Sequence, residues 1–385
     1  MKSLRLLFVF LFYIAICSCK KNEHIIIPTP VNSFGSVFDS FWVKMNSNYV
    51  YWDIDSSNWD RVYYRYKQSF DRLNLASPAD NKEAFKLFSE LTSGLIDGHF
   101  SIRFNPSIIK DSIINPQLGR KKAEIGFYYP YNYYNVDTNY LDKGYHLIFD
   151  NLFSRNGVPL TVLSGTIKNK VLYFGCNSFK LSKSYATNSV SSIKPAIDFF
   201  FKKLADLPLG CKGIILDFRS NAGGDLWDLN FLFGDFFSSP LYFGALQTKS
   251  NINRLDFSPW IPSYITPKQS HPKQLPRIIV LGDRNSASLA EMAIFVVKTI
   301  PGSSFIGEQT YGATGPIVDF EVLNAGSFTV SNFMTVQCAS AKFKYNDEKI
   351  YEGKGILPDH SIPYNFSSLS SGKDRVLEKA LDVLN

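Results

Sequence analysis

Cysteine is scarce in this chain, with five among 385 residues. Two of them lie close to the N-terminus, and Cys176, Cys211 and Cys338 are far apart among apolar or small neighbours. Such scattered cysteines exclude a dense disulfide framework and leave room for at most one bridge, so we expect buried, unreactive thiols. CxxC and HExxH pairings are absent too, and the sequence therefore predicts no metal site.

Charge is also sparse and evenly spread. Charged residues make up 19% of the chain, and the net charge of +7 comes from lysines and arginines that form no long block, only short groups such as Lys121-Lys122 and Lys202-Lys203. A diffuse basic balance is typical of a soluble surface, and it predicts no nucleic-acid partner. The G-x-G-x-x-G spacing of dinucleotide-binding loops is absent, so we expect no organic cofactor.

Aromatic and aliphatic residues, by contrast, are plentiful: 45% of the chain is hydrophobic, with 33 phenylalanines and 21 tyrosines. A chain of this length predicts one large domain and a smaller one. Apolar spacing of three and four predicts early helices, whereas apolar runs and helical patterns alternate from residue 171 onward. We therefore expect an α/β fold with a mixed, partly parallel sheet, preceded by a small helical N-terminal domain. The expected helices and strands are 37–45, 59–70, 81–94, 171–176, 193–204, 212–218, 227–234, 277–281, 304–307 and 373–384.

The N-terminus reads as a signal segment. A positive start is followed by an apolar run over 6–16 that is too short for a comfortable membrane span. The run ends in I-C-S-C, which resembles a bacterial lipoprotein signal with Cys19 as the lipidated residue, since the small Ser18 precedes it. A plain secretory signal is the alternative. We expect a signal over 1–19, a tether over 20–34, and a lipid anchor in the cell envelope, by default at the bacterial outer membrane.

Two serines stand between the apolar run 278–281 and the helical pattern 290–298. Capping a helix requires only one of Ser286 and Ser288. A serine at this corner would also lie beside unsatisfied N–H groups at the positive end of the helix, which suits a nucleophile in acyl transfer. The pattern therefore leaves a cap and a nucleophile as alternatives.

A second candidate element is L216-D-F-R-S-N-A-G-G-D225. The adjacent glycines Gly223 and Gly224 allow the backbone to approach a ligand closely, or they simply form a tight turn. A base is the third element, and the chain holds five histidines: His24, His99, His146, His271 and His360. Only His99 sits between a glycine turn and a strand, where an imidazole would be presented to a cleft.

Together, four stretches resemble the superfamily of tail-specific (C-terminal processing) serine peptidases, and within it the tricorn-core branch. They occur in the family's order and cover most of residues 35–365. The four are L95-I-D-G-H99, D217-F-R-S-N-A-G-G224, S286-A-S-L-A-E291 followed by I306-G-E-Q-T-Y-G312, and I350-Y-E-G-K-G-I-L-P-D359. The resemblance implies a ClpP/crotonase-like catalytic core.

Carried over by position, the family's nucleophile lies three residues before Glu291, which selects Ser288 and leaves Ser286 and Glu291 in support. The processing branch places a lysine 25 residues after its nucleophile, and that position is Ala313 here. The tricorn-like branch uses a histidine steadied by a glutamate, which implies His99 as base and Glu352 as its partner.

The same resemblance implies oxyanion donors from the N–H groups of Gly223 or Gly224 and of Leu289. It also implies a PDZ module, yet the interval 106–165 is short and lacks its Gly-Leu-Gly signature. The aromatic run 128–134 is more simply explained by packing than by a peptide groove.

The sequence thus predicts an envelope serine endopeptidase that cleaves peptides or unfolded proteins with a Ser/His/Glu arrangement, without metal or cofactor. A non-catalytic binding lipoprotein on the same scaffold and a structural lipoprotein are the alternatives. Beyond the signal and tether we expect a helical domain over 35–105, a short connecting region over 106–165 and the catalytic domain over 166–385. The oligomeric state stays open.

Overall fold

The computed structural model describes residues 31–105, 107–109, 112–268, 275–317 and 325–385. The expected signal over 1–19, with Cys19, lies outside these residues, as does most of the tether over 20–34. Within the described part, no helix combines the length and the apolar character that crossing a membrane requires.

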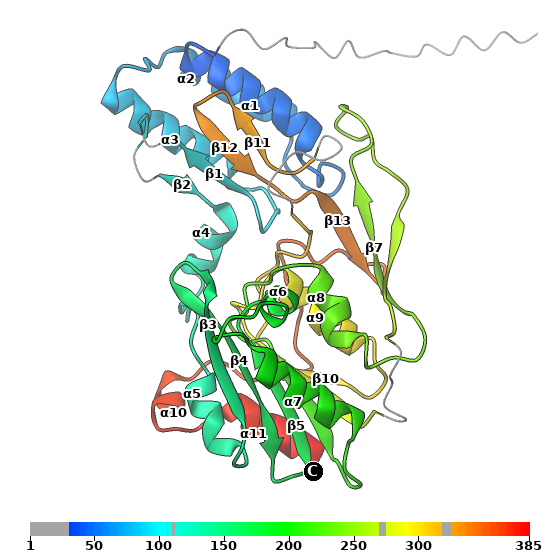
Figure 1. Ribbon diagram of the computed structural model, residues 1–385. Coiled ribbons are helices and arrows are strands. Elements are labelled where there is room, and N and C mark those ends of the chain that lie inside the picture. The colour runs from blue at the N-terminus through cyan, green and yellow to red at the C-terminus, as the bar shows by residue number, and fades with distance from the viewer. Residues whose placement is uncertain (1–30, 106, 110–111, 269–274, 318–324) are drawn as a thin grey trace, which may run out of the picture.

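The largest element is a seven-stranded mixed sheet (Figure 1). Its first five strands are parallel to one another, and each of the last two is antiparallel to the strand before it. This confirms the partly parallel sheet that the alternating pattern predicted. In spatial order the strands are β14 (His360–Ser361), β10 (Ser304–Gly307), β9 (Arg277–Gly282), β6 (Gly213–Asp217), β5 (Val171–Cys176), β4 (Val158–Ile167) and β3 (His146–Arg155).

Helices cover both faces of this sheet, and each face has its own core. Successive side chains of a strand point to opposite faces, so one strand contributes to both cores. In β6, Ile214 and Leu216 belong to one core and Ile215 to the other. The first core includes residues of α7 and α9, and the second includes residues of α11. The helices around the sheet are α5 (Tyr134–Asp137), η1 (Thr138–Tyr140), α6 (Leu181–Tyr185), α7 (Lys194–Ala205), α8 (Trp227–Phe233), α9 (Leu289–Lys298), α10 (Phe366–Ser370) and α11 (Arg375–Leu384).

The N-terminal unit lies at the opposite end of the molecule (Figure 1). Its three helices begin at side-chain caps on Ser33, Asn58 and Ser77. They share a core with a four-stranded sheet, two strands of which come from the C-terminal half of the chain. The elements are α1 (Phe34–Asn48), α2 (Trp59–Asp71), α3 (Pro78–Thr92), β11 (Phe328–Val330), β12 (Met334–Gln337), β1 (Ser101–Phe104) and β2 (Ile113–Ile114).

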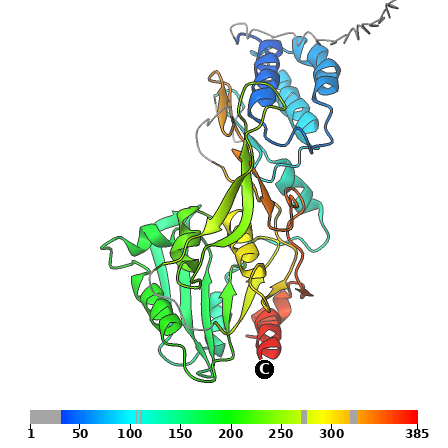
Figure 2. The ribbon, with the colours of Figure 1, turned by 90° about the vertical axis from the view of Figure 1, so that its right-hand side faces the viewer.

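Between the two units run α4 (Pro116–Ala123) and a three-stranded sheet, which spans the junction in Figure 2. That sheet has the order β13 (Ala341–Tyr345), β7 (Leu241–Thr248) and β8 (Ile261–Ile265). The boundary expected at residue 165 needs correction, because it falls inside β4. The β3–β4 hairpin therefore belongs to the large sheet, and backbone pairing rather than composition decides this.

Candidate active site

The turn between β9 and α9 holds Ser288 in an uncommon conformation. Ser288 is the N-cap of α9, with φ 58° and ψ −121°. A positive φ in a residue with a Cβ costs about 1–3 kcal/mol and is typical of functional sites. A strained strand-to-helix turn of this kind presents a serine hydroxyl beside the free N–H groups of a helix start.

Ser286 is a structural part of the same turn. Its buried hydroxyl donates to the Phe218 carbonyl at 2.8 Å and accepts from the Asp283 N–H at 2.8 Å. Because both roles of the hydroxyl are taken, Ser286 joins the end of β6 to the turn rather than facing a substrate.

Glu291 fixes the turn that carries Ser288 through hydrogen bonds to its carboxylate. Its buried carboxylate accepts hydrogen bonds from the Ser288 N–H (3.1 Å), the Thr310 hydroxyl (2.5 Å), the Gly312 N–H (2.8 Å) and the Ala313 N–H (2.8 Å). Burial raises the pKa of Glu291 to about 7, against the opposing effect of these bonds. The carboxylate therefore ties the start of α9 to the segment after β10.

The glycine loop lies directly against Ser288. A Cβ added at Gly223 would stand 2.7 Å from the Cβ of Ser288, and the φ of Gly223 is 84°, so only glycine fits. The Gly223 N–H donates to the Asn221 side chain at 2.8 Å. Among the described residues, the N–H groups of Gly224 and Leu289 have no acceptor. Of the two glycines, Gly224 is therefore the one with a donor left for a ligand.

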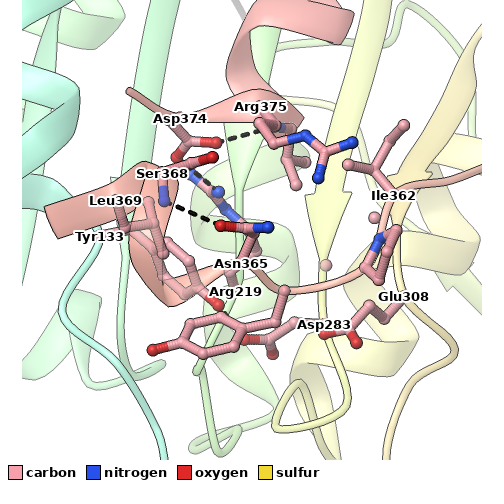
Figure 3. Close-up of a pocket in the computed structure, with 15 residues that line it drawn as sticks. Tyr133, Arg219, Asp283, Glu308, Ile362, Asn365, Ser368, Leu369, Asp374 and Arg375 are labelled. Atoms are coloured by element: carbon pink, nitrogen blue, oxygen red, sulfur yellow. Dashed lines mark hydrogen bonds and ion pairs between the residues drawn. The ribbon is translucent and has the colours of Figure 1, made fainter. Parts of the chain in front are cut away.

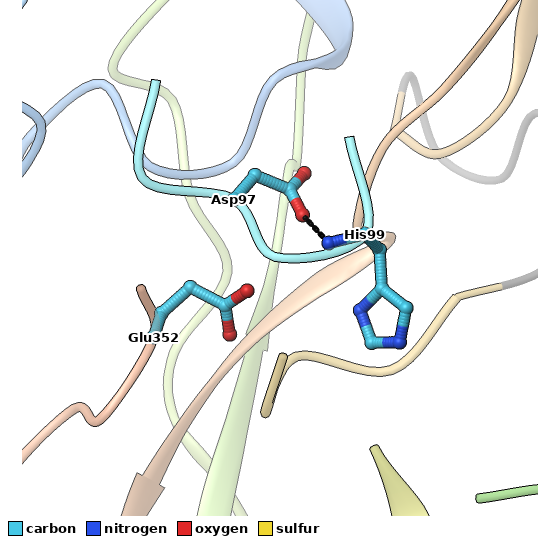
Figure 4. Close-up of side chains that lie close together, drawn as sticks. All are labelled: Asp97, His99 and Glu352. Carbon is cyan, nitrogen blue, oxygen red and sulfur yellow. Dashed lines mark hydrogen bonds between the residues drawn. The ribbon is translucent and has the colours of Figure 1, made fainter. Parts of the chain in front are cut away.

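His99 lies between the two units, just before β1 (Figure 4). Its backbone N–H donates to Asp97 at 2.8 Å, which fixes the turn that carries the ring. One nitrogen of the imidazole and one oxygen from each of Asp97 and Glu352 lie within 4.8 Å of one another. The buried Nδ1 nevertheless has no hydrogen-bond partner in the described part of the chain. Sequence reasoning missed Asp97, although it stands in the same motif two residues before His99.

Glu352 is a buried carboxylate surrounded by donors. One oxygen accepts from the Gly98 N–H at 2.7 Å, and the other accepts from the N–H and hydroxyl of Thr314 and from the Gly315 N–H, at 2.7–2.8 Å. Burial raises the pKa of Glu352, and these donors oppose the rise. Burial and the charge of Glu352 raise the pKa of Asp97 to about 8. Each of these two buried carboxyls therefore binds a proton more tightly than an exposed carboxyl does.

These three side chains are a poor fit to a metal ion. The oxygens of Glu352 are occupied by four donors, and those of Asp97 accept from the N–H groups of His99 and Ala339, each at 2.8 Å. A cation would have to displace several of these buried hydrogen bonds.

The segment 310–315 joins the two sides of the site. Its successive N–H groups point first to Glu291 and then to Glu352. A Cβ added at Gly98 would stand 2.6 Å from the Cα of Ala313, so the turn carrying His99 rests on this segment. Ala313 is the position where the resemblance puts the lysine of the processing branch. The histidine motif is therefore packed against that position.

Arg155, which sequence reasoning also missed, stands beside the glycine loop at the end of β3. Its guanidinium donates to the Ala222 carbonyl at 3.0 Å. Burial, followed by the positive charge of Arg155, lowers the pKa of His99 to about 4. The imidazole is therefore neutral over most of the pH range, as a proton acceptor must be.

The glycine loop is anchored at its start by a buried arginine. Arg219 forms ion pairs with Asp217 (2.6 Å), Asp374 (2.6 Å) and Asp137 (3.2 Å), and its guanidinium lies 4.0 Å from the ring centroid of Tyr133. One cation among three carboxylates joins β6, α5 and the start of α11. The arginine of this motif is thus a structural clamp.

A small cavity borders this clamp (Figure 3). Its lining includes Asp283, Glu308, Asn365 and Arg375, and it offers about 20 Å³ to a water-sized molecule, enough for roughly one water. Neither Ser288 nor His99 lines it. The cavity is therefore distinct from the candidate active site.

The aromatic run 128–134 packs against this region. The Tyr128 ring stacks on Tyr364 at 3.8 Å, and its hydroxyl donates to Glu308. The Tyr133 hydroxyl donates to Asp283 at 3.0 Å. Packing, rather than an open peptide groove, explains these residues.

The other histidines and cysteines of the described residues play no part in the site. The His146 ring lies 5.1 Å from Phe199, and His360 belongs to β14, whereas His24 and His271 are outside the described residues. The cysteines Cys176, Cys211 and Cys338 are unbridged. The first and last of these are buried as expected, but Cys211 is only partly buried because it lies in the loop before β6.

Comparison with known proteins places this geometry in a family. Residues 171–362 match Peptidase family S41. A structure of a candidate peptidase from Parabacteroides merdae is 21% identical, with 91% of this chain and 96% of that chain covered and a TM-score of 0.68. A structure of mature CPAF complexed with lactacystin is 10% identical, with 91% and 98% covered and a TM-score of 0.59. No curated protein sequence matches the chain. Residues 171–362 therefore form a serine peptidase domain of Peptidase family S41, in the tail-specific superfamily, and the chain has the fold of the two solved structures.

Proposed function

We propose that Ser288 is the nucleophile, His99 its general base and Glu352 the carboxylate that supports the base. His99 takes the hydroxyl proton as Ser288 attacks the scissile carbonyl, and returns it to the leaving amine. A water then attacks the acyl-enzyme with His99 again as base; the ester bond breaks, the peptide acid leaves and the proton returns to Ser288. The carboxylate of Glu352 stabilises the imidazolium that forms in each step.

The observation that carries this proposal is the sharing of segment 310–315 by Glu291 and Glu352. Glu291, which binds the first part of the segment, also binds the Ser288 N–H. Glu352, which binds the second part, also binds the Gly98 N–H next to His99. The contact of Gly98 with Ala313 adds support, because a histidine motif lies where the lysine of the processing branch is missing. The resulting Ser/His/Glu arrangement is that of the tricorn-like branch.

The oxyanion donors that we propose are the N–H groups of Gly224 and Leu289, which lack acceptors among the described residues. Leu289 follows Ser288 in the chain, and Gly224 follows Gly223, which lies against Ser288. Removing one donor of this kind costs about a hundred- to a thousandfold in rate. The substrates that we propose are peptides or unfolded protein segments of the cell envelope, since a scissile bond must enter the site in an extended form.

Fluorophosphonate labelling of the purified protein tests the nucleophile. We expect mass spectrometry to find a single adduct in the native protein, on Ser288. The Ser288→Ala variant should lose both the label and the cleavage of β-casein, an unfolded protein. Ser250→Ala, at an exposed serine after β7, is the matched control and should leave the label in place. A label that persists in a folded Ser288→Ala protein would refute this assignment, and a folded native protein without any label would favour a non-catalytic binding role.

We also propose that Cys19 carries a lipid anchor, on the strength of the sequence before it. The full chain should then sediment with membranes, and Cys19→Ser should release it to the soluble fraction. Equal partition of the two proteins would exclude the anchor.

A further inference from the structure

The β3–β4 hairpin ends in a turn that fixes the position of Arg155. Asn156 and Gly157 both have positive φ, 50° and 79°, as a two-residue type I′ turn requires. Arg155 and Val158 pair across this turn, so Arg155 is the last residue of its strand. The β3–β4 register is irregular between Asp150 and Arg155, and Arg155 itself is paired again at the turn, so the guanidinium projects from the paired end of the hairpin.

This hairpin tip stands at the candidate active site. Arg155 donates to the carbonyl of Ala222, whose neighbour Gly223 lies against Ser288. The charge of Arg155 also acts on His99, which comes from the other side of the site. Arg155 is thus bonded to the loop that contacts Ser288, and its charge reaches His99, although it belongs to neither motif.

The charge of Arg155 has no counterion within the described residues. None of the ion pairs there includes Arg155, whereas Lys180 and Lys183 nearby both pair with Asp225 at 2.8 Å. Its side chain is exposed, and its bond to Ala222 uses one of five N–H donors. A planar guanidinium with free donors is the side chain best suited to bind a carboxylate in two places.

We propose that Arg155 determines specificity by binding a carboxylate of the peptide substrate close to the scissile bond. This inference rests on the proposed function. The carboxylate belongs either to an acidic side chain or to the C-terminus of the peptide, and both present the same chemistry to the guanidinium. The hairpin thereby supplies a recognition element in a chain that lacks the PDZ signature.

The test is a cleavage profile on a defined library of synthetic 14-residue peptides, read by mass spectrometry. The best substrate is then remade in matched forms, with its acidic residue changed to the amide (Glu to Gln or Asp to Asn) or with its C-terminal acid changed to an amide. For the wild-type protein we expect kcat/KM to fall about tenfold in one of these arms, the loss of one charge-assisted pair. The arm that responds identifies the source of the carboxylate.

The variants then assign the effect to Arg155. In Arg155→Gln, kcat/KM should be the same for the acid and amide forms of the peptide. Arg155→Glu should prefer a peptide in which lysine replaces the acidic residue. Arg72→Glu, the same charge change on an exposed arginine after α2, should keep the wild-type ratio. A wild-type ratio near one in both arms, or a ratio that survives in Arg155→Gln, overturns the inference. Fluorophosphonate labelling separates these results from failure of the proposed function, since an unlabelled wild-type protein would refute the latter.

Discussion

On the nucleophile side of the site Glu291 accepts four hydrogen bonds, whereas on the base side the Nδ1 of His99 has no partner among the described residues. Ser288 belongs to a turn between two elements of one core. His99 instead follows an Asp-Gly turn and rests on a segment from the other unit. The two sides therefore differ in what is held: hydrogen bonds fix the backbone on both sides, but no hydrogen bond in the described part of the chain fixes the His99 Nδ1.

This difference indicates which groups of the site are already in place before substrate binds. Strain in the Ser288 backbone persists because the bonds to Glu291 and the contact with Gly223 determine it from several directions. On the other side, the carboxylate of Glu352 orients backbone rather than the imidazole. We infer that the imidazole forms its hydrogen bond to a carboxylate only when substrate excludes water, since catalytic hydrogen bonds are often completed in the substrate complex.

The largest effect is expected from His99→Ala. Loss of a general base lowers the rate by about a hundred- to ten-thousandfold. Stability should change by no more than about 1 kcal/mol, because the ring nitrogen makes no buried bond. Labelling rates with fluorophosphonate and urea unfolding measure the two quantities. A large loss of stability with a normal labelling rate would contradict the division between the two sides.

Glu291→Gln should produce the reverse pattern. An amide nitrogen would face N–H donors that now point at a carboxylate, and we expect a loss of about 3 kcal/mol in the free energy of unfolding. Labelling of Ser288 should slow as its turn relaxes. Glu83→Gln, on an exposed face of α3, is the control and should leave both unchanged. Equal stability of the two variants would show that the nucleophile side is not held by Glu291.

The pH dependence of His99 sharpens the comparison. Its pKa is lowered to about 4 from an ordinary 6.5, so between these values the unfolded chain binds a proton that the folded chain refuses. The contribution of His99 to stability is present above pH 6.5 and is lost as the pH falls toward 4. Urea unfolding at pH 7 and 4.5 should therefore show a larger loss for the native protein than for His99→Ala.

Arg155→Gln tests the cause of that shift. Removing a positive charge makes protonation of the imidazole easier, and we expect the pKa of His99 to rise toward its ordinary value, with burial still holding it below 6.5. Histidine NMR resolves the titration, with His99→Ala used to assign the resonance. An unchanged titration would show that Arg155 does not act on the base.

Much of this fold follows from local pattern. The strands at 277–281 and 304–307 and the helix after Ser288 appear where the sequence predicts them. Buried strands and amphipathic helices have characteristic patterns of apolar residues within a short stretch of sequence. The pairing of β12 with β1 joins Ser101 to Gln337 and has no local signal. For the same reason the N-terminal unit, expected to be helical alone, contains a sheet.

The site divides in the same way. Ser288, Glu291 and the glycine loop stand in recognisable motifs, and the structure brings them into contact. Arg155 belongs to no recognisable motif. Its position at the site depends on where the β3–β4 hairpin ends, beside the glycine loop. The Asn-Gly pair that follows it is a strong local signal for such a hairpin, but nothing in the sequence says where its tip lies.

The smallest effect concerns the backbone of Ser288. At φ 58° a glycine is free of the strain that any Cβ imposes, so Ser288→Gly should be about 1 kcal/mol more stable than Ser288→Ala. Neither variant carries a nucleophile, and the comparison therefore isolates backbone strain from catalysis. Thermal and urea unfolding measure the difference.

Ser89, in the middle of α3, provides the matched pair. There glycine should be about 1 kcal/mol less stable than alanine, as in any helix interior. The sign of the glycine–alanine difference should thus reverse between the two positions. The same sign at both would mean that the turn imposes no strain on Ser288, and the contrast between a rigid nucleophile and an open base would lose its physical basis.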